Sequence, residues 1–324
     1  MKILVTARSF RQTPGRHHEL LEQSGHEVME SPVDRPLKEA ELVELIGDAD
    51  GVILGLDYVT AEVIEAGGQL KVLSRYGVGV DRVDLEAATE AGVVVTNTPG
   101  TNHIAVAELT LGLMLSLARL IPQHNRRAKE GSWAREKGTE LAGKTVGIIG
   151  LGTVGREVAK RLRGFDAKLV VHDPYVSADV VEGQGAQRVD LETLLREADI
   201  VTLHAPLTEK TRGMLGQQEF LLMKPAAYLV NTARAELTDE DELYEVLKSG
   251  GIGGAALDVF AQEPPPPDYP LLQLPNVVAT PHVGATTYES IVRMGTMAVE
   301  NTLQALRGER PAHVVNPEVY ERPK

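Results

Sequence analysis

The sequence predicts an α/β protein with two doubly wound parallel sheets. Short apolar runs alternate with segments of helical spacing along most of the chain, an order typical of parallel sheets covered by helices. The segment KTVGIIGLGTVG at 144–155 joins an apolar run, a glycine turn and a helix, as dinucleotide-binding units do. Residues 42–56 and 191–207 share one order, a helix, an Ala-Asp pair and a strand. The pattern therefore indicates two Rossmann-like domains of related topology.

The first domain is expected to open with a strand. Its apolar run is short and meets Arg8, so the N-terminus does not read as a signal peptide. Turn-forming residues such as Gly25 separate the elements that follow. The expected strands lie at 2–6, 26–29, 51–54, 70–74 and 93–96, and the expected helices at 16–23, 37–46, 61–66 and 85–90.

The same alternation returns after residue 144. Its apolar runs read TVGII, LVVHD, IVTLHAP, AYLVNTA and GAALDVF, with helical segments between them. A long apolar helix at 104–121 connects the domains, and a final helix at 286–307 could carry the chain back to the first one. We therefore expect one domain at 1–101 plus 286–324 and the other at 102–285. A cleft between two such domains is a preferred ligand site, so we expect the active site there.

Composition excludes several classes of partner. The 324 residues carry a net charge of −13, which disfavours nucleic acid and anionic membranes. The longest apolar stretch, 104–121, contains Glu108 and Arg119 and meets Pro122, so a buried helix fits it better than a membrane span. The absence of cysteine excludes disulfides, thiolate metal sites and a cysteine nucleophile. We expect a soluble, cytoplasmic protein that acts on a small molecule.

The glycine turn indicates a dinucleotide. Gly150 permits the tight turn, Gly152 lets the backbone approach a pyrophosphate, and Gly155 lets the helix pack closely on the strand. The pyrophosphate would bind the free amides and the positive dipole end at the start of the helix. A glycine-rich turn of some other α/β protein is the simpler alternative, but the strand before and the helix after favour the dinucleotide.

Asp173 predicts which dinucleotide binds. It ends the next apolar run, near the position from which an acid binds the adenosine ribose hydroxyls. A carboxylate repels a 2′-phosphate, and residues 174–177 offer no Arg or Lys to hold one. We therefore expect NAD as the cofactor, bound by the domain at 102–285, and substrate binding by the domain at 1–101 plus 286–324.

Four further features lie at expected carboxyl ends of strands, where functional loops of such sheets gather. The glycine-rich segment 75–81 offers the amides of Val78 and Gly79 to an anion, although an ordinary turn would look the same. Arg234 could clamp a carboxylate, and a surface ion pair is its alternative. Glu263 and His282 would each be unremarkable alone, as a solvated loop acid and one of nine histidines.

Taken together, these residues suit the oxidation of a 2-hydroxy acid. His282 would be the base for the hydroxyl proton, Glu263 would orient and charge-stabilise the imidazole, and Arg234 would face the substrate oxygens. Metal-dependent hydrolysis is disfavoured because no second histidine at ligand spacing accompanies His282, so no metal is expected. A serine hydrolase is disfavoured because no G-x-S-x-G elbow is present.

The chain resembles the D-isomer-specific 2-hydroxyacid dehydrogenases, and within them the phosphoglycerate dehydrogenase-like branch. The motifs that carry the resemblance span essentially its whole length: SRYGVGVDRVDLEAA, TNTPGTNHIAVAELTLGLML, GKTVGIIGLGTVGREVA with VHDPY, LVNTARAEL, AALDVFAQEPPP and TPHVGATT. The resemblance implies an NAD-dependent enzyme with Arg234, Glu263 and His282 as catalytic residues, and Val78 and Gly79 as amides that receive the substrate carboxylate. It also implies these cofactor contacts: Gly150, Gly152, Thr153, Val154, Gly155, Asp173, Ala205, Ala233, Asp258, which in such enzymes bonds the nicotinamide carboxamide, and Gly284.

The sequence departs from the family pattern in three places. After Arg234 the family usually has glycine and then Val-Asp or Ile-Asp, whereas residues 235–239 read AELTD, so Ala235 should restrict the loop if that position needs a positive φ. Many phosphoglycerate enzymes carry an arginine at the end of the third strand, where Leu54 stands. Finally, no C-terminal regulatory domain follows, so feedback by serine through such a domain is not expected.

These departures leave the substrate open. The hypothesis is 3-phosphoglycerate and 3-phosphohydroxypyruvate, as in serine biosynthesis, with Arg75 and Arg135 as cations for the distal phosphate and surface ion pairs as their alternative. By resemblance, Arg135 reaches that phosphate from a neighbouring subunit, in a homodimer formed through the cofactor domain and the apolar helix at 104–121. The alternatives are a hydroxypyruvate or glyoxylate reductase and, from a different class, an NAD-sensing corepressor-like binding protein.

Overall fold

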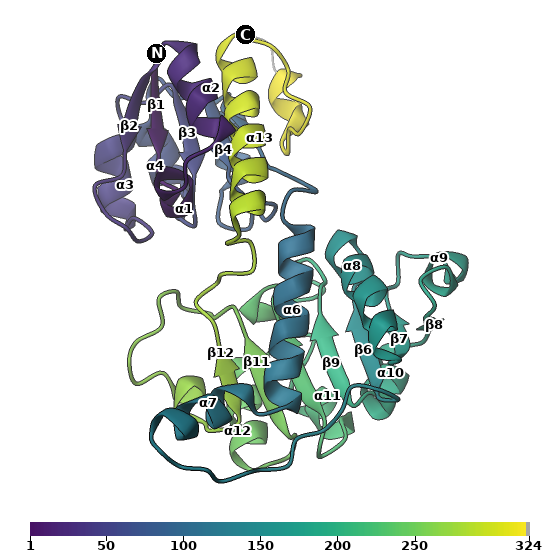
Figure 1. The fold of residues 1–324 in the computed structure, drawn as a ribbon. Helices are drawn as coiled ribbons and strands as arrows, with labels where there is room; N and C mark the ends of the chain where they lie inside the picture. Colours follow the sequence, from purple (N-terminus) through teal and green to yellow (C-terminus); the bar gives the residue numbers. More distant parts are fainter. Residues whose placement is uncertain (322–324) are drawn as a thin grey trace. The chain divides into compact units, whose positions relative to one another are not determined.

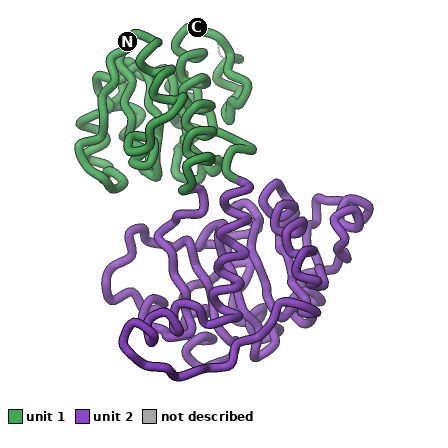
Figure 2. Tube along the Cα trace, in the orientation of Figure 1, with its two compact units in different colours: residues 1–102, 286–324 green, residues 103–285 purple. Residues whose placement is uncertain are grey.

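The computed structural model describes residues 1–321, which form two compact units. One unit consists of residues 1–102 together with the chain from Thr286 onward, and the other of residues 103–285 (Figures 1 and 2). Each unit contains one parallel sheet, of five strands in the first and seven in the second. The predicted fold class of two doubly wound parallel-sheet domains is thereby confirmed.

The first unit has its strands in the order β2-β1-β3-β4-β5. Some of its helices begin at side-chain caps, since Thr60 accepts from the N–H of Val63 and Asp84 accepts from the N–H of Ala87. Its strands are β1 (Lys2–Val5), β2 (Glu27–Glu30), β3 (Gly51–Leu54), β4 (Val72–Arg75) and β5 (Val94–Thr96), and its helices are α1 (Arg8–Gln12), α2 (Arg16–Ser24), α3 (Glu39–Ile46), α4 (Ala61–Ala66), α5 (Leu85–Glu90), α13 (Tyr288–Leu306) and the 3₁₀ helix η4 (Pro317–Tyr320).

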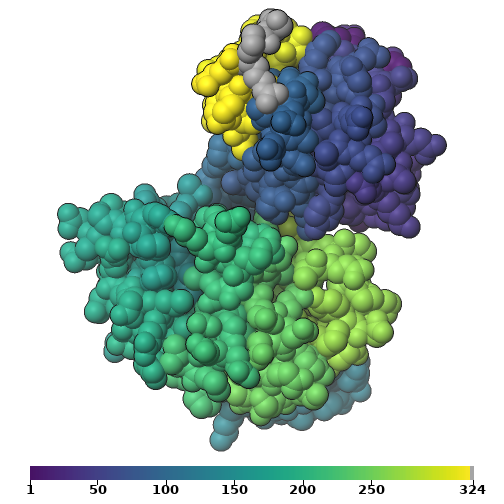
Figure 3. All heavy atoms as spheres, turned by 180° about the vertical axis from the view of Figure 1, so that it is seen from behind, coloured from purple at the N-terminus to yellow at the C-terminus, as the bar shows by residue number. Residues whose placement is uncertain are grey.

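The last helix, α13, packs against the opening part of the chain. A side-chain carbon at Gly295 would lie 2.7 Å from the ring of His17 in α2, so the two helices approach closely only because that position is glycine. Figures 1 and 3 show the yellow C-terminal residues beside the purple and blue N-terminal ones within this unit. The expected return of the chain through residues 286–307 is therefore present in α13.

The second unit has its strands in the order β12-β11-β10-β9-β6-β7-β8. Its strands are β6 (Thr145–Ile149), β7 (Lys168–His172), β8 (Gln187–Arg188), β9 (Ile200–Leu203), β10 (Tyr228–Asn231), β11 (Gly254–Leu257) and β12 (Val277–Ala279). Its helices are α6 (His103–Ala118), α7 (Ile121–Lys129), α8 (Thr153–Leu162), α9 (Ala178–Glu182), α10 (Leu191–Glu197), α11 (Gln217–Leu222) and α12 (Glu240–Lys248), with the 3₁₀ helices η1 (Arg163–Phe165), η2 (Ala235–Leu237) and η3 (Pro270–Gln273).

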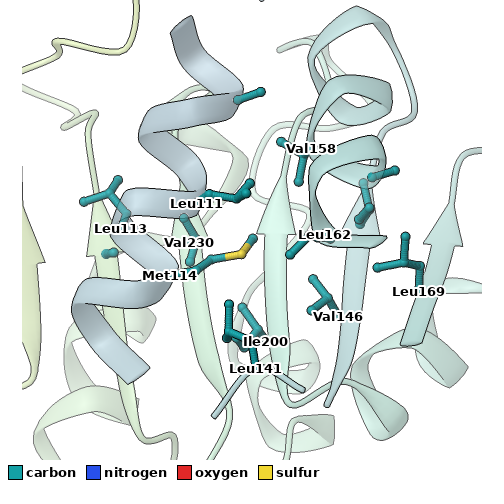
Figure 4. Packing of buried hydrophobic residues seen from close by; sticks show 14 of the residues in the cluster. Leu111, Leu113, Met114, Leu141, Val146, Val158, Leu162, Leu169, Ile200 and Val230 are labelled. Carbon is teal, nitrogen blue, oxygen red and sulfur yellow. The ribbon is translucent and has the colours of Figure 1, made fainter. Parts of the chain in front are cut away.

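Both faces of the second sheet are buried, which explains the continuous apolar runs of its strands. Side chains alternate between the faces, so that Ile200 and Val230 join one hydrophobic cluster while Val201 and Leu229 join another. The first cluster lies under α6 and α8, where Figure 4 shows Met114, Val158 and Ile200 among the packed side chains. The second cluster includes residues of α10, α11 and α12. The sheet is thus fixed from both sides, and its loops start from a rigid edge.

Several predicted elements have shifted ends in the structure, and the long apolar helix differs most. The helix expected at 104–121 ends at Ala118, and α7 begins at Ile121 after Leu120 takes the left-handed conformation at φ 52°. Pro122 lies in the first turn of α7, where a missing N–H costs no hydrogen bond, so the chain turns before the proline rather than at it. Within residues 1–321, no single helix is long and apolar enough to cross a membrane, and the bent pair of α6 and α7 passes that test only by length and composition.

Candidate active site

Three neighbouring strands of the second unit end at one edge of its sheet. Asn231, Leu257 and Ala279 are the last residues of β10, β11 and β12, and they pair in register. The segments that follow carry Arg234, Glu263 and His282 respectively. Carboxyl ends of parallel strands meet at one edge, and there the predicted catalytic residues leave the sheet.

The structure brings Glu263 and His282 into direct contact. The Nδ1 atom of His282 lies 3.0 Å from Oε1 and 2.9 Å from Oε2 of Glu263. A carboxylate only accepts, so Nδ1–H is the donor and Nε2 is left as the ring nitrogen that can exchange a proton with a ligand. The Glu263 side chain is 10% exposed and that of His282 is 24% exposed. The carboxylate is therefore enclosed behind an imidazole that solvent still reaches.

The backbone at His282 takes the left-handed conformation, with φ at 51°, which is uncommon for a residue other than glycine. Asp258 holds this turn, because its carboxylate accepts from the hydroxyl of Thr280 at 2.6 Å and from the N–H groups of Val283 at 2.9 Å and Gly284 at 2.8 Å. Burial raises the pKa of Asp258, and these hydrogen bonds and the nearby His282 oppose that rise. Asp258 thus fixes the turn that presents His282.

Arg234 follows a turn that Asn231 organises. The buried Asn231 side chain accepts from the N–H of Ala233 at 3.0 Å and donates to the carbonyl of Arg234 at 2.8 Å. Thr232 is hydrogen-bonded to Thr110 of α6 at 2.9 Å, which ties the turn to the core helix. The Arg234 guanidinium donates to the carbonyl of Ala233 at 2.7 Å. The side chain that the sequence singled out is therefore held near its own strand end.

Ala235, which stands where the family usually has glycine, adopts an ordinary backbone conformation. Ala235 is buried and begins η2, and it is not among the residues with positive φ. The position therefore does not need glycine in this chain, and the restriction expected from the sequence does not arise.

The glycine turn fits a dinucleotide. Gly150 has φ at 92°, and a side-chain carbon there would lie 2.6 Å from the backbone nitrogen of Ala205, so the loop after β9 packs against the turn. Gly152 is exposed, and a side-chain carbon added there would have no neighbouring atom within 4 Å. Among residues 1–321, no acceptor is found for the N–H groups of Thr153 and Val154 at the start of α8. Open space and free amides at a helix start are what a pyrophosphate requires.

Asp173 lies beside this turn. Its carboxylate accepts from the N–H of Leu151 at 2.8 Å and from the N–H of Tyr175 at 2.9 Å. The remaining lone pairs can accept from a ribose diol. The side chain therefore supports the glycine turn and keeps lone pairs for the ribose hydroxyls that the sequence predicts it to bind.

The other predicted cofactor contacts are Ala205, Ala233, Asp258 and Gly284. Ala205 and Ala233 follow β9 and β10 at the same sheet edge. The N–H of Gly284 is taken by Asp258, so these two groups satisfy each other in this structure. Sequence reasoning assigned Asp258 to the cofactor alone and did not foresee its role in holding residues 280–284, for which an acid directly after a buried strand was the available signal.

The remaining candidates lie elsewhere in the chain. In the first unit, Gly77 donates to the Thr98 hydroxyl at 2.9 Å, while no acceptor for the N–H groups of Val78 and Gly79 is found in the described part of the chain. Arg75 is the last residue of β4, pairs in register with Leu54, and donates to the carbonyl of Tyr76. The second unit holds Arg135 in a fully exposed stretch after α7.

Asn231, Thr232 and His204 were missed by sequence reasoning. The first two are buried polar residues at or directly after a strand end, a pattern that could have marked them. His204 follows β9, and its Nε2 lies 3.0 Å from the Thr202 hydroxyl. Burial lowers the pKa of His204 to about 3, so its imidazole is neutral.

Comparison with known proteins agrees with this geometry. Residues 111–284 match the family model of the D-isomer specific 2-hydroxyacid dehydrogenase, NAD binding domain. The chain belongs to the D-isomer specific 2-hydroxyacid dehydrogenase family. This match confirms the predicted family and NAD as the cofactor of its binding domain.

The relatives within this dehydrogenase family differ in their named activities. The chain is 49% identical to the D-3-phosphoglycerate dehydrogenase of Methanocaldococcus jannaschii, over 90% of its own length and 56% of that protein. It is 41% identical to the glyoxylate reductase of Thermofilum pendens, over 91% of its length and 89% of that protein. The chain thus spans about half the length of the phosphoglycerate dehydrogenase relative and nearly all of the glyoxylate reductase.

Solved structures of this dehydrogenase family share the fold. The apo-structure of D-lactate dehydrogenase from Escherichia coli superposes with a TM-score of 0.85 at 30% identity, covering 97% of this chain and all of that one. The likeness extends over both parallel-sheet units.

We expect at least a tenfold preference for NAD over NADP in kcat/KM, on the order that an uncompensated charge in a binding site produces. The Asp173 carboxylate would face the 2′-phosphate of NADP, and residues 174–177 supply no Arg or Lys to hold that phosphate. Asp173→Asn removes the charge and retains one of the two acceptor oxygens, so it can keep the hydrogen bond from Leu151 while losing the one from Tyr175. It should narrow the gap between NAD and NADP, chiefly through weaker NAD binding. Steady-state kinetics with both cofactors measures this, with Asp179→Ala as a control on an exposed acid nearby. Equal use of the two cofactors by the native protein contradicts the assignment.

Proposed function

We propose that the protein is an NAD-dependent D-2-hydroxyacid dehydrogenase whose substrates are 3-phosphoglycerate and 3-phosphohydroxypyruvate. The observation that supports this most is the pairing of both Glu263 oxygens with Nδ1 of His282, at the sheet edge from which Arg234 also leaves. In this proposal, residues 102–285 bind the cofactor and residues 1–101 plus 286–324 bind the substrate.

The catalytic roles follow from the chemistry of a 2-hydroxy acid. In oxidation, the Nε2 atom of His282 takes the proton of the substrate hydroxyl as the carbon–hydrogen bond at that carbon breaks. Glu263 stabilises the imidazolium that forms, because a carboxylate next to a cation lowers the energy of the charged form. Arg234 places a fixed positive charge against the substrate oxygens, and in reduction the same groups act in reverse.

The substrate carboxylate is received by the free N–H groups of Val78 and Gly79, which suit an anion as backbone nests do. The cofactor is held by Gly150, Gly152, Gly155, Asp173 and the start of α8. When bound, NAD would supply the hydride transfer to or from the substrate carbon. The protein residues then need only bind, orient and exchange one proton.

Whether the substrate is a phosphorylated or a simple hydroxy acid depends on the cations available to bind a distal phosphate. A dianion in a partly closed site wants at least one cation beyond those on the carboxylate. Leu54 is 1% exposed and apolar, so it supplies none, whereas Arg75 occupies the neighbouring strand end. We propose that Arg75 and Arg135 provide this charge, with Arg135 acting in a homodimer.

A hydroxypyruvate or glyoxylate reductase is the second candidate. The buried Leu54 at the carboxyl end of β3 favours it, and so does the similarity to a glyoxylate reductase over nearly that protein's whole length. The NAD-sensing corepressor-like alternative is less favoured, since a binding protein has no need of a paired Glu263 and His282.

Arg135→Ala should raise the KM for 3-phosphohydroxypyruvate by roughly tenfold or more, the cost of losing one charge-assisted contact, and leave hydroxypyruvate nearly unaffected. Both substrates are assayed with NADH, and Arg126→Ala on the exposed face of α7 is the matched control. Equal losses on the two substrates, or no preference of the native protein for the phosphorylated one, would favour the reductase candidate instead.

We also propose a cytoplasmic protein that works as a homodimer and, with these substrates, in serine biosynthesis. Exposed Ile104, Ile121 and Trp133 support the dimer, because apolar side chains that remain exposed in one chain are available for burial against another.

A further inference from the structure

Glu240 is a half-buried carboxylate that the proposed mechanism does not use. It is the first residue of α12, and both of its oxygens accept hydrogen bonds from a different segment. Oε1 accepts from the N–H of Ala261 at 3.2 Å, and Oε2 accepts from the hydroxyl of Tyr269. Ala261 lies in the segment after β11 that carries Glu263. Glu240 therefore accepts a hydrogen bond from this segment close to Glu263, the residue that contacts His282.

The segment from Phe260 to Glu263 is held by several contacts that converge. The N–H of Phe260 donates to Oε1 of Glu263 at 3.2 Å, so the Glu263 side chain is fixed partly by its own backbone. The Phe260 ring packs edge-on against Tyr269, with centroids 5.9 Å apart at 86°. Tyr269 also donates its hydroxyl to Glu240. The Phe260 ring, Tyr269 and the Glu240 carboxylate are therefore connected by contacts that hold the segment of Glu263.

Glu240 is itself placed by elements next to Arg234. Asp239 caps α12 by accepting from the N–H groups of Asp241 and Glu242, which fixes where the helix begins. The helix follows η2 directly, and η2 follows Arg234. Because the cap is supplied by Asp239, the Glu240 side chain is not needed at the helix start and is free to serve the neighbouring segment. It thereby connects the Arg234 turn with the segment of Glu263.

The surroundings of Glu240 disfavour the charged form of its carboxylate. Burial raises the pKa of Glu240, and the nearby Glu236 and Asp241 raise it further, while the hydrogen bonds from Tyr269 and Ala261 lower it. A half-buried charge beside two like charges destabilises a fold unless hydrogen bonds compensate it. If this position contributed only to stability, a neutral side chain would be more favourable than glutamate. A role in placing Glu263 explains why a carboxylate is present.

We propose that Glu240 is a positioning residue, which together with Tyr269 fixes Ala261 and so holds Glu263 in its bidentate contact with His282. The inference rests on the proposed function, because it gives the Glu263 and His282 pair its catalytic meaning. It adds two residues, on α12 and before η3, that touch neither substrate nor cofactor and act through Glu263.

The test compares Glu240→Ala, Glu240→Gln and Tyr269→Phe with Glu263→Gln. Glu245→Ala, on the exposed face of the same helix, is the matched control. Glu240→Ala should lower kcat for 2-oxo acid reduction roughly tenfold, as misplacement of a catalytic group does, with little change in NADH affinity measured by fluorescence. Glu240→Gln, which keeps the shape and one acceptor, should recover part of this loss, and Tyr269→Phe should show a smaller loss.

The pH profile separates positioning from a general structural effect. Reduction needs the imidazolium of His282 as proton donor, and the carboxylates of Glu263 and the nearby Asp258 both favour that form. Glu263→Gln should therefore move the alkaline limb of kcat/KM to lower pH, and Glu240→Ala should move it the same way by less. In the double variant Glu240→Ala/Glu263→Gln, the loss should not exceed that of Glu263→Gln alone, because both changes remove one interaction.

The outcomes also separate this inference from the proposed function. If the losses from Glu240→Ala and Glu263→Gln multiply, or if Glu240→Ala lowers only Tm and leaves the pH limb in place, the positioning role is wrong. If Glu263→Gln itself turns over normally with an unchanged profile, the proposed function is wrong. Should Glu240→Ala fail to fold, Tyr269→Phe decides the question, since it removes one hydroxyl and should still move the limb.

Discussion

His282→Asn should lower kcat by at least about two orders of magnitude, the typical contribution of a general acid–base, while NADH affinity hardly changes. In the proposed mechanism the ring contributes the Nε2 atom that exchanges the substrate proton, while Glu263 contacts Nδ1. Asparagine is a sharper substitution than alanine because it tolerates the left-handed backbone, at φ 51°, that this position requires. The loss should therefore reflect chemistry and not a rearranged turn.

Stopped-flow turnover and NADH fluorescence titration of the purified variant measure the two quantities separately. His124→Ala, in α7 of the same unit, is the control for removing an imidazole away from the sheet edge. Near-normal turnover of His282→Asn would sink the assignment of His282 as the catalytic base.

Gly155→Ala should weaken NAD binding at least tenfold and lower the free energy of unfolding by about 1–3 kcal/mol, the usual cost of overpacking. A side-chain carbon at this position would lie 2.2 Å from the carbonyl oxygen of Gly150, which is backbone and cannot move aside without opening the turn. The start of α8 would then be displaced from the strand that precedes it, and with it the amides that we propose bind the pyrophosphate.

Two neighbouring glycines make this prediction specific. Gly152→Ala should leave Tm unchanged, because no atom lies within 4 Å of the added carbon and φ at −72° is ordinary. It should still weaken NAD binding, because the added carbon would occupy space that we propose for the pyrophosphate. Gly164→Ala, also in open space but away from the turn, should change neither quantity. Native affinity in Gly152→Ala would contradict the placement of the cofactor on this turn, whatever Gly155→Ala does.

Local chemistry allowed the glycine turn and the strands to be predicted. Strand β6, the turn from Gly150 to Gly155 and helix α8 are contiguous, so their spacing alone encodes the geometry. Strands β3 and β6 and helices α4 and α5 begin and end where the apolar runs indicate. The predicted break between α6 and α7 lies in the wrong place. Proline interrupts a helix when it stands in the interior, but Pro122 lies in the first turn of α7, where proline is tolerated.

The active-site contacts depend on the tertiary structure because their partners are remote in sequence. Sequence alone determined the family, the cofactor turn and the residue types that could do chemistry. Glu263 and His282 are 19 residues apart and meet only because β11 and β12 end in register at one edge. The same holds for Glu240 and Tyr269, 29 residues apart, and for Asp258 on the turn of His282. A periodic pattern records burial and local turns, whereas the pairing of side chains from different strand ends is set by strand order and register, which no short stretch of sequence encodes.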